Sequence, residues 1–568
     1  AWEADFNKVD ELVAKVEAFN GKLNTKEGLL EFLSVEEEMD KVISKLFTYS
    51  HMKYDLNQRD NEAASYYSRI YSKYSQAMAK IAFTSPQILA NGYETVKEWV
   101  KDNEEYHYNL ERLFRNQTHI LDEKSEKLMA NYGEALSGFS KLYDALSNVD
   151  NKSVKVTLSD GKEYDINASN YRSYLGKLQN QDDRRLVFEA VFKHYDDHKT
   201  TFAGIYKGIM NSENVSVKNR GYKNILESHL YNNNIPEDVF HSLVNTARYN
   251  CEPLKEYIKL RKKYFNLDTY HTYDRFLDLK ESNIKLDYES AKSLFLEAAK
   301  SLGEDFYNHA AKVLESGRVS VYPADGKRSG AYSTGVYGVG PFILLNFTNT
   351  LDDAFTLAHE AGHSIHTMYS SENQPFQTHN YVIFVAEVAS TFNEQLLLDH
   401  LLKTMTDPTE KIVVLQQAID GLIGTFYRQT LFANYEYLAH KLVEENKVVD
   451  SEALSKIMVD LYKDYYDIDL NDEPYKDKVW AYIPHLFRTP FYVYQYATSF
   501  SASLAIYNKV KNKEENAFEN YIKLLSAGGS DYPIEIIKLA GVDLSTEEPF
   551  KAVVNRLDEL VKMLKELL

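Results

Sequence analysis

Apolar residues recur at steps of three and four along most of the chain, which is the period of an amphipathic helix. The run "FNKVDELVAKVEAF", residues 6–19, shows the pattern clearly. Similar runs follow one another to about residue 150, and they return from about residue 168 to 315. We therefore predict that residues 1 to about 150 form a helical region, structural or lid-forming, that carries no cluster of metal ligands.

The spacing of apolar residues changes to every second position in two segments, which predicts short strands. "VKVTLSDGKEYDI", residues 154–166, alternates on both sides of Asp160-Gly161, a dipeptide that favours tight hairpin turns. "RVSVYPADGKRSGAYSTGVYGVGPFILLNF", residues 318–347, contains two β-rich runs separated by glycines. We expect a small sheet or a strand–loop–strand segment there, leading into a helix. The predicted fold class is mainly α.

Composition supports a helical, globular protein of more than one subdomain. The chain has 568 residues, 23 of them glycine and 12 proline, so turns are scarce and one core is not enough. The net charge of −19 argues against nucleic acid or an anionic membrane as a partner.

Location is indicated by what the sequence lacks. Cys251 is the single cysteine, so no internal disulfide can form, and a reducing compartment is favoured. The side chain of Cys251 is expected to be half-buried and to serve in packing, not as a nucleophile. The first residues have no basic and apolar signal-peptide pattern, and no apolar run reaches about 20 residues. We predict a cytoplasmic protein that does not enter the membrane.

The strongest chemical feature is "TLAHEAGHSIHT", residues 356–367, in which His359, Glu360 and His363 form H-E-x-x-H. On a helix, positions four apart lie on one face, so both imidazoles can bind one ion and Glu360 can reach a water beside it. Thr350 and Asp353 resemble a capping box that starts this helix independently of the motif. An interior glycine, Gly362, costs about 1 kcal/mol, which indicates close packing. The alternative is an exposed helix with two unrelated histidines.

The third ligand is less certain from spacing. Residues 366 and 369 are histidine and tyrosine, which excludes the metzincin pattern, and His366 lies about 10 Å along the helix from His359. A glutamate of the next predicted helix, 381–402, is the alternative. Glu387 lies among apolar residues, where a carboxylate needs a partner. That partner is zinc or a basic side chain. Glu394 is a competing ligand or a partner for a histidine.

A downstream segment, "AYIPHLFRTPFYVYQYATSF", residues 481–500, supplies possible donors for an oxyanion. They are His485, Tyr492, Tyr494 and Tyr496. A tyrosine cluster of this kind is also common in simple packing.

Three segments together resemble the oligoendopeptidase F group of the M3 (thimet oligopeptidase-like) zinc metallopeptidases. They are "GKRSGAYSTGVYGVGPFILLNF", "FTLAHEAGHSIHTMYSS" with "IFVAEVASTFNE", and "IPHLFRTPFYVYQYATSF". The resemblance covers the C-terminal two-thirds, and the helical N-terminal third agrees in character. It implies a mainly α, ellipsoidal fold with a deep channel between two helical halves and a small β segment beside the active site.

The resemblance also implies roles for residues. His359, His363 and Glu387 would hold one Zn²⁺ per chain, and Glu360 would be the general base. His485 would stabilise the tetrahedral intermediate together with a tyrosine. We favour Tyr492 and Tyr496, which are four apart, over Tyr494, although the spacing after His485 differs from the thimet-type branch. The glycine-rich stretch 329–335 would line the channel and bind extended substrate through Gly330, Ala331, Tyr332 and Gly335. Alternatively, Gly330 and Gly335 are only turn residues.

The leading functional hypothesis is a zinc endopeptidase that cleaves short, unstructured oligopeptides. A zinc carboxypeptidase or dipeptidase is the enzymatic alternative, in which Arg488 grips a terminal carboxylate. A non-catalytic helical peptide-binding protein is the third hypothesis. We expect an N-terminal helical domain with the hairpin, 1–190, a catalytic domain, 191–568, and a monomer.

Overall fold

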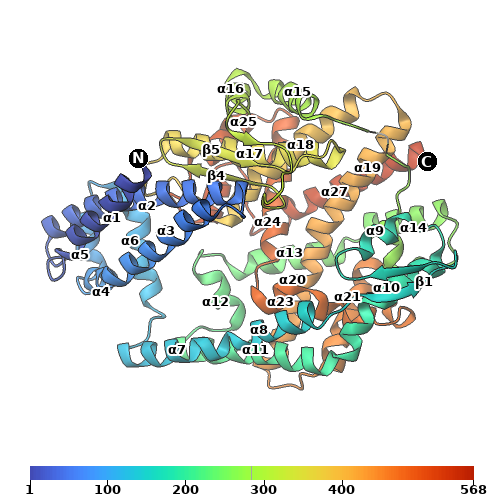
Figure 1. The fold of residues 1–568 in the computed structure, drawn as a ribbon, viewed down its shortest axis with the longest axis horizontal. Coiled ribbons are helices and arrows are strands. Elements are labelled where there is room, and N and C mark those ends of the chain that lie inside the picture. The colour runs from blue at the N-terminus through green and yellow to red at the C-terminus, as the bar shows by residue number, and fades with distance from the viewer. Residues whose placement is uncertain (283) are drawn as a thin grey trace. The chain divides into compact units, whose positions relative to one another are not determined.

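The computed structural model describes residues 1–282 and 284–568, and it is mainly α-helical with five short strands among these residues (Figure 1). The predicted fold class is confirmed. The chain forms two compact units, each built from three separate segments. Unit 1 comprises residues 1–118, 284–403 and 506–542, and unit 2 comprises 119–283, 404–505 and 543–568. These units interleave along the sequence, whereas the expected domains are contiguous, so the boundary at 190 stays a prediction.

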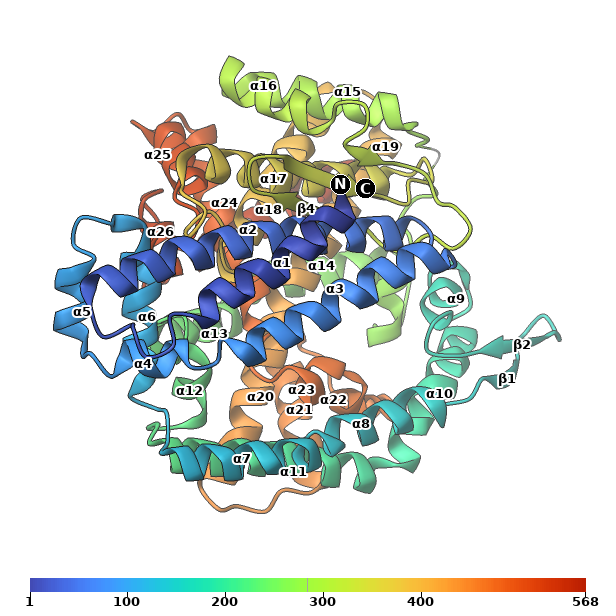
Figure 2. The same cartoon turned by 60° about the vertical axis from the view of Figure 1, so that its left-hand side comes forward.

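Unit 1 begins with three packed helices, α1 (Trp2–Glu17), α2 (Lys26–Leu56) and α3 (Asn61–Lys80) (Figure 2). The predicted apolar face of α1 is confirmed, because Val9, Leu12, Val13 and Val16 are buried in one cluster with residues of α2. Short helices follow: α4 (Thr84–Leu89), α5 (Tyr93–Trp99), η1 (Glu104–Tyr106) and α6 (His107–Gln117).

The second segment of unit 1 contains the predicted small sheet. After α15 (Tyr288–Ala299), η4 (Lys300–Leu302) and α16 (Glu304–Val313) come β3 (Val319–Ser320), β4 (Tyr332–Val336) and β5 (Gly340–Leu344). The order is β3-β5-β4, with β5 parallel to β3 and antiparallel to β4. Two long helices follow, α17 (Leu351–Asn373) and α18 (Ile383–Thr404), and α17 packs on β4 and β5. The unit is completed by α25 (Ala517–Ser526) and α26 (Pro533–Lys538).

Unit 2 starts with α7 (Glu123–Leu136), α8 (Gly138–Asp144), the π-helical turn η2 (Ala145–Val149) and a hairpin of β1 (Val154–Thr157) and β2 (Glu163–Ile166). The hairpin is the predicted one. Its strands pair from Val154↔Ile166 to Thr157↔Glu163, and Gly161 has a φ of +74° in the turn, a conformation that favours glycine.

The remainder of unit 2 is helical. It comprises α9 (Tyr171–Lys177), α10 (Gln181–Asp197), α11 (Lys199–Arg220), α12 (Ile225–Tyr231), α13 (Glu237–Tyr249), α14 (Glu252–Tyr264), η3 (Thr272–Phe276), α19 (Pro408–Leu422), η5 (Ile423–Tyr427), α20 (Arg428–Glu444), α21 (Ser451–Tyr466), η6 (Leu470–Asp472), η7 (Lys476–Lys478), α22 (Val479–Tyr482), α23 (Pro484–Arg488) and α27 (Glu548–Leu567). Helix α24 (Tyr494–Lys511) continues from unit 2 into unit 1.

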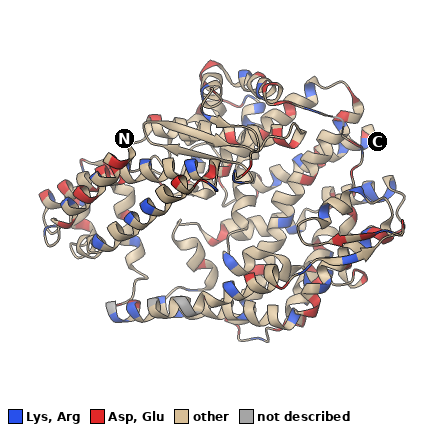
Figure 3. Ribbon diagram, viewed as in Figure 1, with Lys and Arg blue, Asp and Glu red and all other residues tan. Residues whose placement is uncertain are grey.

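Surface and core features agree with the composition. Acidic and basic residues are interspersed over the helices (Figure 3). Within the described ranges, no helix has the length and apolarity to cross a bilayer. Cys251 is buried, and its thiol donates to the carbonyl of Ala247 over 3.0 Å. Burial raises the pKa of this thiol to about 12, so it is a packing residue and not a nucleophile.

Candidate metal centre

Helix α17 starts at the predicted capping box. The amide of Asp353 donates to Oγ1 of Thr350 over 3.2 Å, and the amide of Thr350 donates to Oδ2 of Asp353 over 2.9 Å. The helix buries Ala358 and Ile365, which lie on its apolar face. Because the cap and the apolar face fix both its start and its rotation, His359 and His363 come to one side, as expected.

The candidate ligands of one ion come from α17 and α18. A nitrogen of His359, a nitrogen of His363 and an oxygen of Glu387 all lie within 4.8 Å of one another. Oε2 of Glu387 is 3.4 Å from Nε2 of His359 and 3.7 Å from Nε2 of His363. All three side chains are half-buried. Two imidazoles and one carboxylate converging in this way are the donor set of a catalytic zinc site with an open position.

Each candidate ligand is oriented by a further group. Oε1 of Glu394 is 2.5 Å from Nδ1 of His359, and His363 hydrogen-bonds through its ring to the carbonyl of Ala386. The hydroxyl of Ser390 donates to Oε2 of Glu387 over 2.9 Å. The geometry therefore favours Glu387 over Glu394 as the candidate ligand, with Glu394 as a partner of the candidate ligand His359.

Helices α17 and α18 approach closely at Gly362. A Cβ added there would lie 2.6 Å from the carbonyl oxygen of Ala389 and 2.7 Å from Cα of Ser390. Both contacts are with backbone, which cannot rotate away. The predicted close packing is confirmed, and the absence of a side chain at residue 362 brings Glu387 within reach of the two histidines.

Replacing Gly362 by alanine should therefore separate the helices and weaken metal binding. We expect a loss of about 1–3 kcal/mol in the free energy of unfolding and a fall in metal affinity, measured by denaturant unfolding and by chelator competition. Gly421→Ala is the matched control, because a Cβ on that helical glycine meets nothing within 4 Å. The control should be neutral or slightly stabilising. Equal metal affinity in Gly362→Ala and the parent would contradict the role of this contact.

Protonation of the histidines reflects the surrounding carboxylates. Burial lowers the pKa of His359, but the hydrogen bond and charge of Glu394, with the charges of Glu387 and Glu360, raise it to about 9. Burial and the charge of His359 lower the pKa of His363 to about 4. A divalent cation competes with the proton on His359, since an imidazole ligand must be neutral.

Glu360 is buried beside the candidate ligands. Burial raises the pKa of its carboxyl to about 7, against the charge of His359 and a hydrogen bond from the backbone amide of Ser333 in β4. The hydroxyl of Ser333 also lies 2.8 Å from that of Ser364 on α17. No sequence pattern singles out Ser333, because its contribution is a backbone amide whose direction depends on strand register.

The predicted substrate-binding stretch is partly a strand and not a loop. Gly330 has a φ of +84° just before β4, which fits the turn interpretation of that residue. Ala331 links it to the strand. Tyr332 stacks on His51 of α2 with ring centroids 5.6 Å apart. A Cβ on Gly335 would lie 2.7 Å from Cγ2 of Thr367, so Gly335 is a packing position against α17 and not a turn residue.

His366 is not part of the candidate ligand set. Its ring is fully buried and stacks on Tyr381, with centroids 3.6 Å apart. Burial lowers its pKa to about 3, so the ring stays neutral. This agrees with the expectation that one ion would not bind both His359 and His366.

The predicted oxyanion donors belong to unit 2, where they form a cluster. The ring of His485 lies 6.2 Å from that of Tyr492 and 6.3 Å from that of Tyr496, and the two tyrosine rings are 5.4 Å apart. All three side chains are half-buried. Tyr494 is 2% exposed and packs on Phe240, which agrees with the preference for its neighbours.

Arg488, the residue expected to grip a terminal carboxylate in the exopeptidase hypothesis, already has a partner. Its Nε donates to Oδ1 of Asp144 over 2.8 Å. That pairing neutralises its charge locally, so the structure gives the exopeptidase hypothesis no free cationic anchor at this residue.

Comparison with known families agrees with this geometry. The model of peptidase family M3 matches residues 174–555, and a model described as oligopeptidase F matches residues 87–152. The chain belongs to peptidase family M3. It is a metallopeptidase, and the resemblance inferred from the three sequence segments is confirmed.

Individual relatives match the M3 chain over its whole length. Oligopeptidase PepF of Bacillus subtilis is 35% identical, with the match covering 100% of this chain and 85% of that protein. The crystal structure of oligoendopeptidase-F from Enterococcus faecium superposes with a TM-score of 0.75 at 27% identity, covering 100% and 98% of the two chains. A candidate peptidase from Chlamydophila abortus gives a TM-score of 0.93 at 30% identity, covering 100% and 96%.

Proposed function

We propose that this M3 metallopeptidase is a zinc-dependent endopeptidase that hydrolyses internal peptide bonds of short, unstructured oligopeptides. The observation that carries the proposal is the convergence of His359, His363 and Glu387 within 4.8 Å, with the Glu360 carboxyl buried beside them. The donor set, two imidazoles and a carboxylate, fits zinc. The names of the relatives, oligopeptidase and oligoendopeptidase, support peptide substrates and internal cleavage.

The chain's own residues divide the chemistry among themselves. When bound, zinc supplies a Lewis acid that polarises the scissile carbonyl and makes water more acidic. Glu360 accepts the proton of the attacking water and passes it to the leaving nitrogen. Glu394 fixes the ring of His359 so that its Nε2 faces the metal position. Ser390 does the same for the carboxylate of Glu387.

Strand β4 is the proposed docking edge for extended substrate. It is the last strand of the β3-β5-β4 sheet, and among the described residues no strand pairs with its outer edge. The amide of Ser333 on this strand bonds Glu360, so the edge runs past the general base. An extended peptide can add to such an edge through main-chain hydrogen bonds, a mode that favours unstructured substrates over folded ones. On this basis Gly330 and Ala331 would contribute backbone and not side-chain contacts.

The imidazole of His485 and the phenols of Tyr492 and Tyr496 are the proposed donors to the oxyanion. We expect His485→Ala to lower kcat by about 10²-fold with little change in KM, because the interaction forms in the transition state. Metal content measured on the same sample is the control and should stay at one ion per chain. An unchanged kcat would reduce His485 to a packing residue.

The overall proposal is tested by mass spectrometry of products from a mixture of unstructured peptides and one unfolded protein, with and without a zinc chelator. We expect chelator-sensitive internal cuts in the short peptides and an intact protein. Removal of terminal residues alone would favour the carboxypeptidase or dipeptidase alternative. No cleavage by protein carrying one zinc would favour a peptide-binding protein. Cytoplasmic location and a monomeric state remain predictions.

A further inference from the structure

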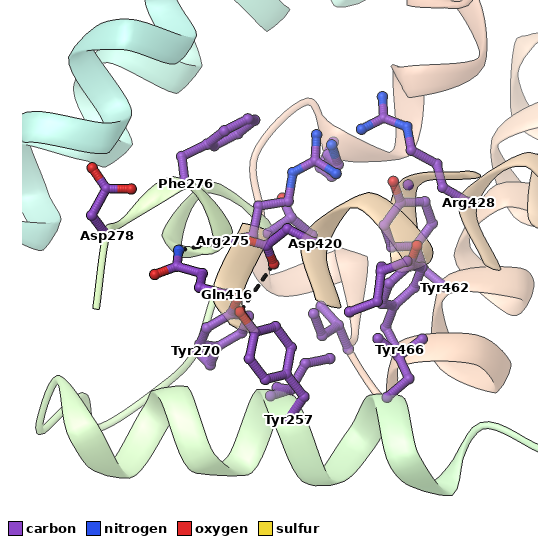
Figure 4. Close-up of a pocket in the computed structure, with 17 residues that line it drawn as sticks. Tyr257, Tyr270, Arg275, Phe276, Asp278, Gln416, Asp420, Arg428, Tyr462 and Tyr466 are labelled. Atoms are coloured by element: carbon purple, nitrogen blue, oxygen red, sulfur yellow. Dashed lines mark hydrogen bonds between the residues drawn. The ribbon is translucent and has the colours of Figure 1, made fainter. Parts of the chain in front are cut away.

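Unit 2 contains a cavity of about 300 Å³ that shares no residue with the candidate metal centre (Figure 4). Its wall comes from α14, η3, α19, η5, the start of α20, the end of α21 and η7. The volume lies at the lower end of small-molecule sites, so the cavity can hold a compact ligand.

Three cationic side chains line this cavity, Arg275 of η3, Arg428 of α20 and Lys476 of η7. Figure 4 shows the guanidinium groups of Arg275 and Arg428 directed toward the same side of the cavity. Lys476 is 7% exposed. Among the described residues, no carboxylate lies within ion-pair distance of any of the three. These cations come from distant parts of the sequence, so the fold assembles them.

The nearby carboxylates are engaged by other donors. Asp420 accepts from the hydroxyl of Tyr257 over 3.0 Å and from Nε2 of Gln416 over 3.3 Å. Glu473 accepts from the amide and the hydroxyl of Thr272 over 2.8 and 2.5 Å. Asp278, the remaining acidic residue of the wall, is exposed to solvent. Within the described part of the chain, none of the three cations therefore forms a direct ion pair, and Glu473 and Asp420 act on Lys476 and Arg275 only through longer-range charge.

The cluster of Arg275, Arg428 and Lys476 is electrostatically unfavourable without a bound anion. Burial, followed by the charges of Arg275 and Arg428, lowers the pKa of Lys476 well below its usual value. Burial and the charge of Arg275 lower the pKa of Arg428 to about 10. Both shifts mean that the protein holds these groups in an environment that opposes their charge. An anion bound between the cations would offset the free-energy cost of burying their charges. Apolar residues of the same size at these positions would not incur that cost at all.

Aromatic rings complete the wall. Tyr462 and Tyr466 stack with centroids 5.2 Å apart, and Nζ of Lys476 lies 5.6 Å from the Tyr462 ring. The Arg275 guanidinium lies 4.5 Å from the ring of Phe276. The rings hold the cationic groups in place and offer flat apolar surface to a ligand that carries more than its charge.

We propose that this cavity binds a small molecule bearing a multivalent oxyanion, held by Arg275, Arg428 and Lys476. Guanidinium forks and a compact ammonium are the groups that proteins use for phosphate and carboxylate oxygens. A phosphate ester is the source that we favour, because three cations in the wall of one cavity suit a dianionic tetrahedral group better than one planar carboxylate. The inference does not depend on the proposed peptidase mechanism.

The test is isothermal titration calorimetry of the full-length protein at constant ionic strength. The ligands are inorganic phosphate, ribose 5-phosphate and succinate, with sodium chloride as the blank. We expect saturable binding of one phosphate ligand per chain. Arg428→Met and Lys476→Met should each weaken it at least tenfold. Arg185→Met, an exposed arginine of the same unit paired with Asp182, is the matched control and should bind as the parent does.

Each outcome decides the proposal. Binding of phosphate compounds that the two cavity variants lose supports a phosphate source, and binding of succinate alone supports a carboxylate source. No saturable binding, or equal binding in the parent and both cavity variants, overturns the proposal. Thermal unfolding without ligand gives a second readout. Lys476→Met should raise Tm or leave it unchanged, because it removes a buried charge that has no ion-pair partner among the described residues. A large fall in Tm would show that Lys476 is a structural cation and would also overturn the proposal.

Discussion

Glu360→Gln should abolish nearly all turnover while the protein keeps its metal. The substitution preserves the size of the side chain and leaves His359, His363 and Glu387 in place, but an amide cannot accept the proton of the attacking water. General-base catalysis contributes about 10²–10⁴-fold, so we expect kcat to fall by about 10³-fold. The measurement is kcat on an internally quenched peptide, with metal content determined on the same preparation.

A matched control lies on the same helix. Glu372 is 47% exposed near the end of α17, where it pairs with His309 over 3.0 Å. Glu372→Gln should leave kcat unchanged within twofold. Activity of Glu360→Gln within a few fold of the parent would overturn the assignment of the base. Loss of metal together with activity would instead give Glu360 a part in holding the ion.

Glu387→Ala should remove the metal itself. Among the described side chains, its carboxylate supplies the one oxygen in the cluster of possible ligands, and loss of one of three protein ligands leaves two imidazoles that also lose their shared counter-charge. Protein purified from the variant should contain far less than one zinc per chain. Turnover should fall with metal content and should recover only partly when excess zinc is added.

Glu394→Ala is the comparison that separates ligand from supporting residue. Its carboxylate meets Nδ1 of His359 and not the shared ligand position. Removal of such a partner weakens metal binding by about 10–100-fold, so the variant should still be fully loaded at high zinc. Competition with a chelator of known affinity measures both variants. Zinc retention by Glu387→Ala equal to that of the parent would remove Glu387 from the site.

Features set by local sequence were predictable. The capping box at Thr350 and Asp353 and the turn at Gly161 depend on residues a few positions apart, and each is found as expected. The helical start of unit 1 follows from the three-and-four periodicity alone. Such signals are short-range, so tertiary packing reinforces them without being needed to recognise them.

Features set by tertiary packing were not predictable. Glu387 and Glu394 are two turns apart on one face of α18, so spacing alone left both open as ligands. The approach of α17 to α18 at Gly362 places Glu387 near both histidines and Glu394 beside Nδ1 of His359 alone. The sequence left open whether the glycine-rich stretch 329–335 is a loop or part of a small sheet, because the pairing of β4 with β5 has no local signature. The cavity cations at 275, 428 and 476 share no sequence pattern, since three separate segments bring them together.

The contact at Gly362 restricts which substitutions this sequence can accept during evolution. An added methyl group there would meet the carbonyl oxygen of Ala389 and Cα of Ser390, atoms that every amino acid possesses. No substitution at 389 or 390 can remove them, so a selection for second-site suppressors should find none on the facing helix. At Gly335, by contrast, the added methyl would meet Cγ2 of Thr367, which a serine at 367 would lack. Position 335 can therefore change together with 367, whereas position 362 has no single partner with which to change.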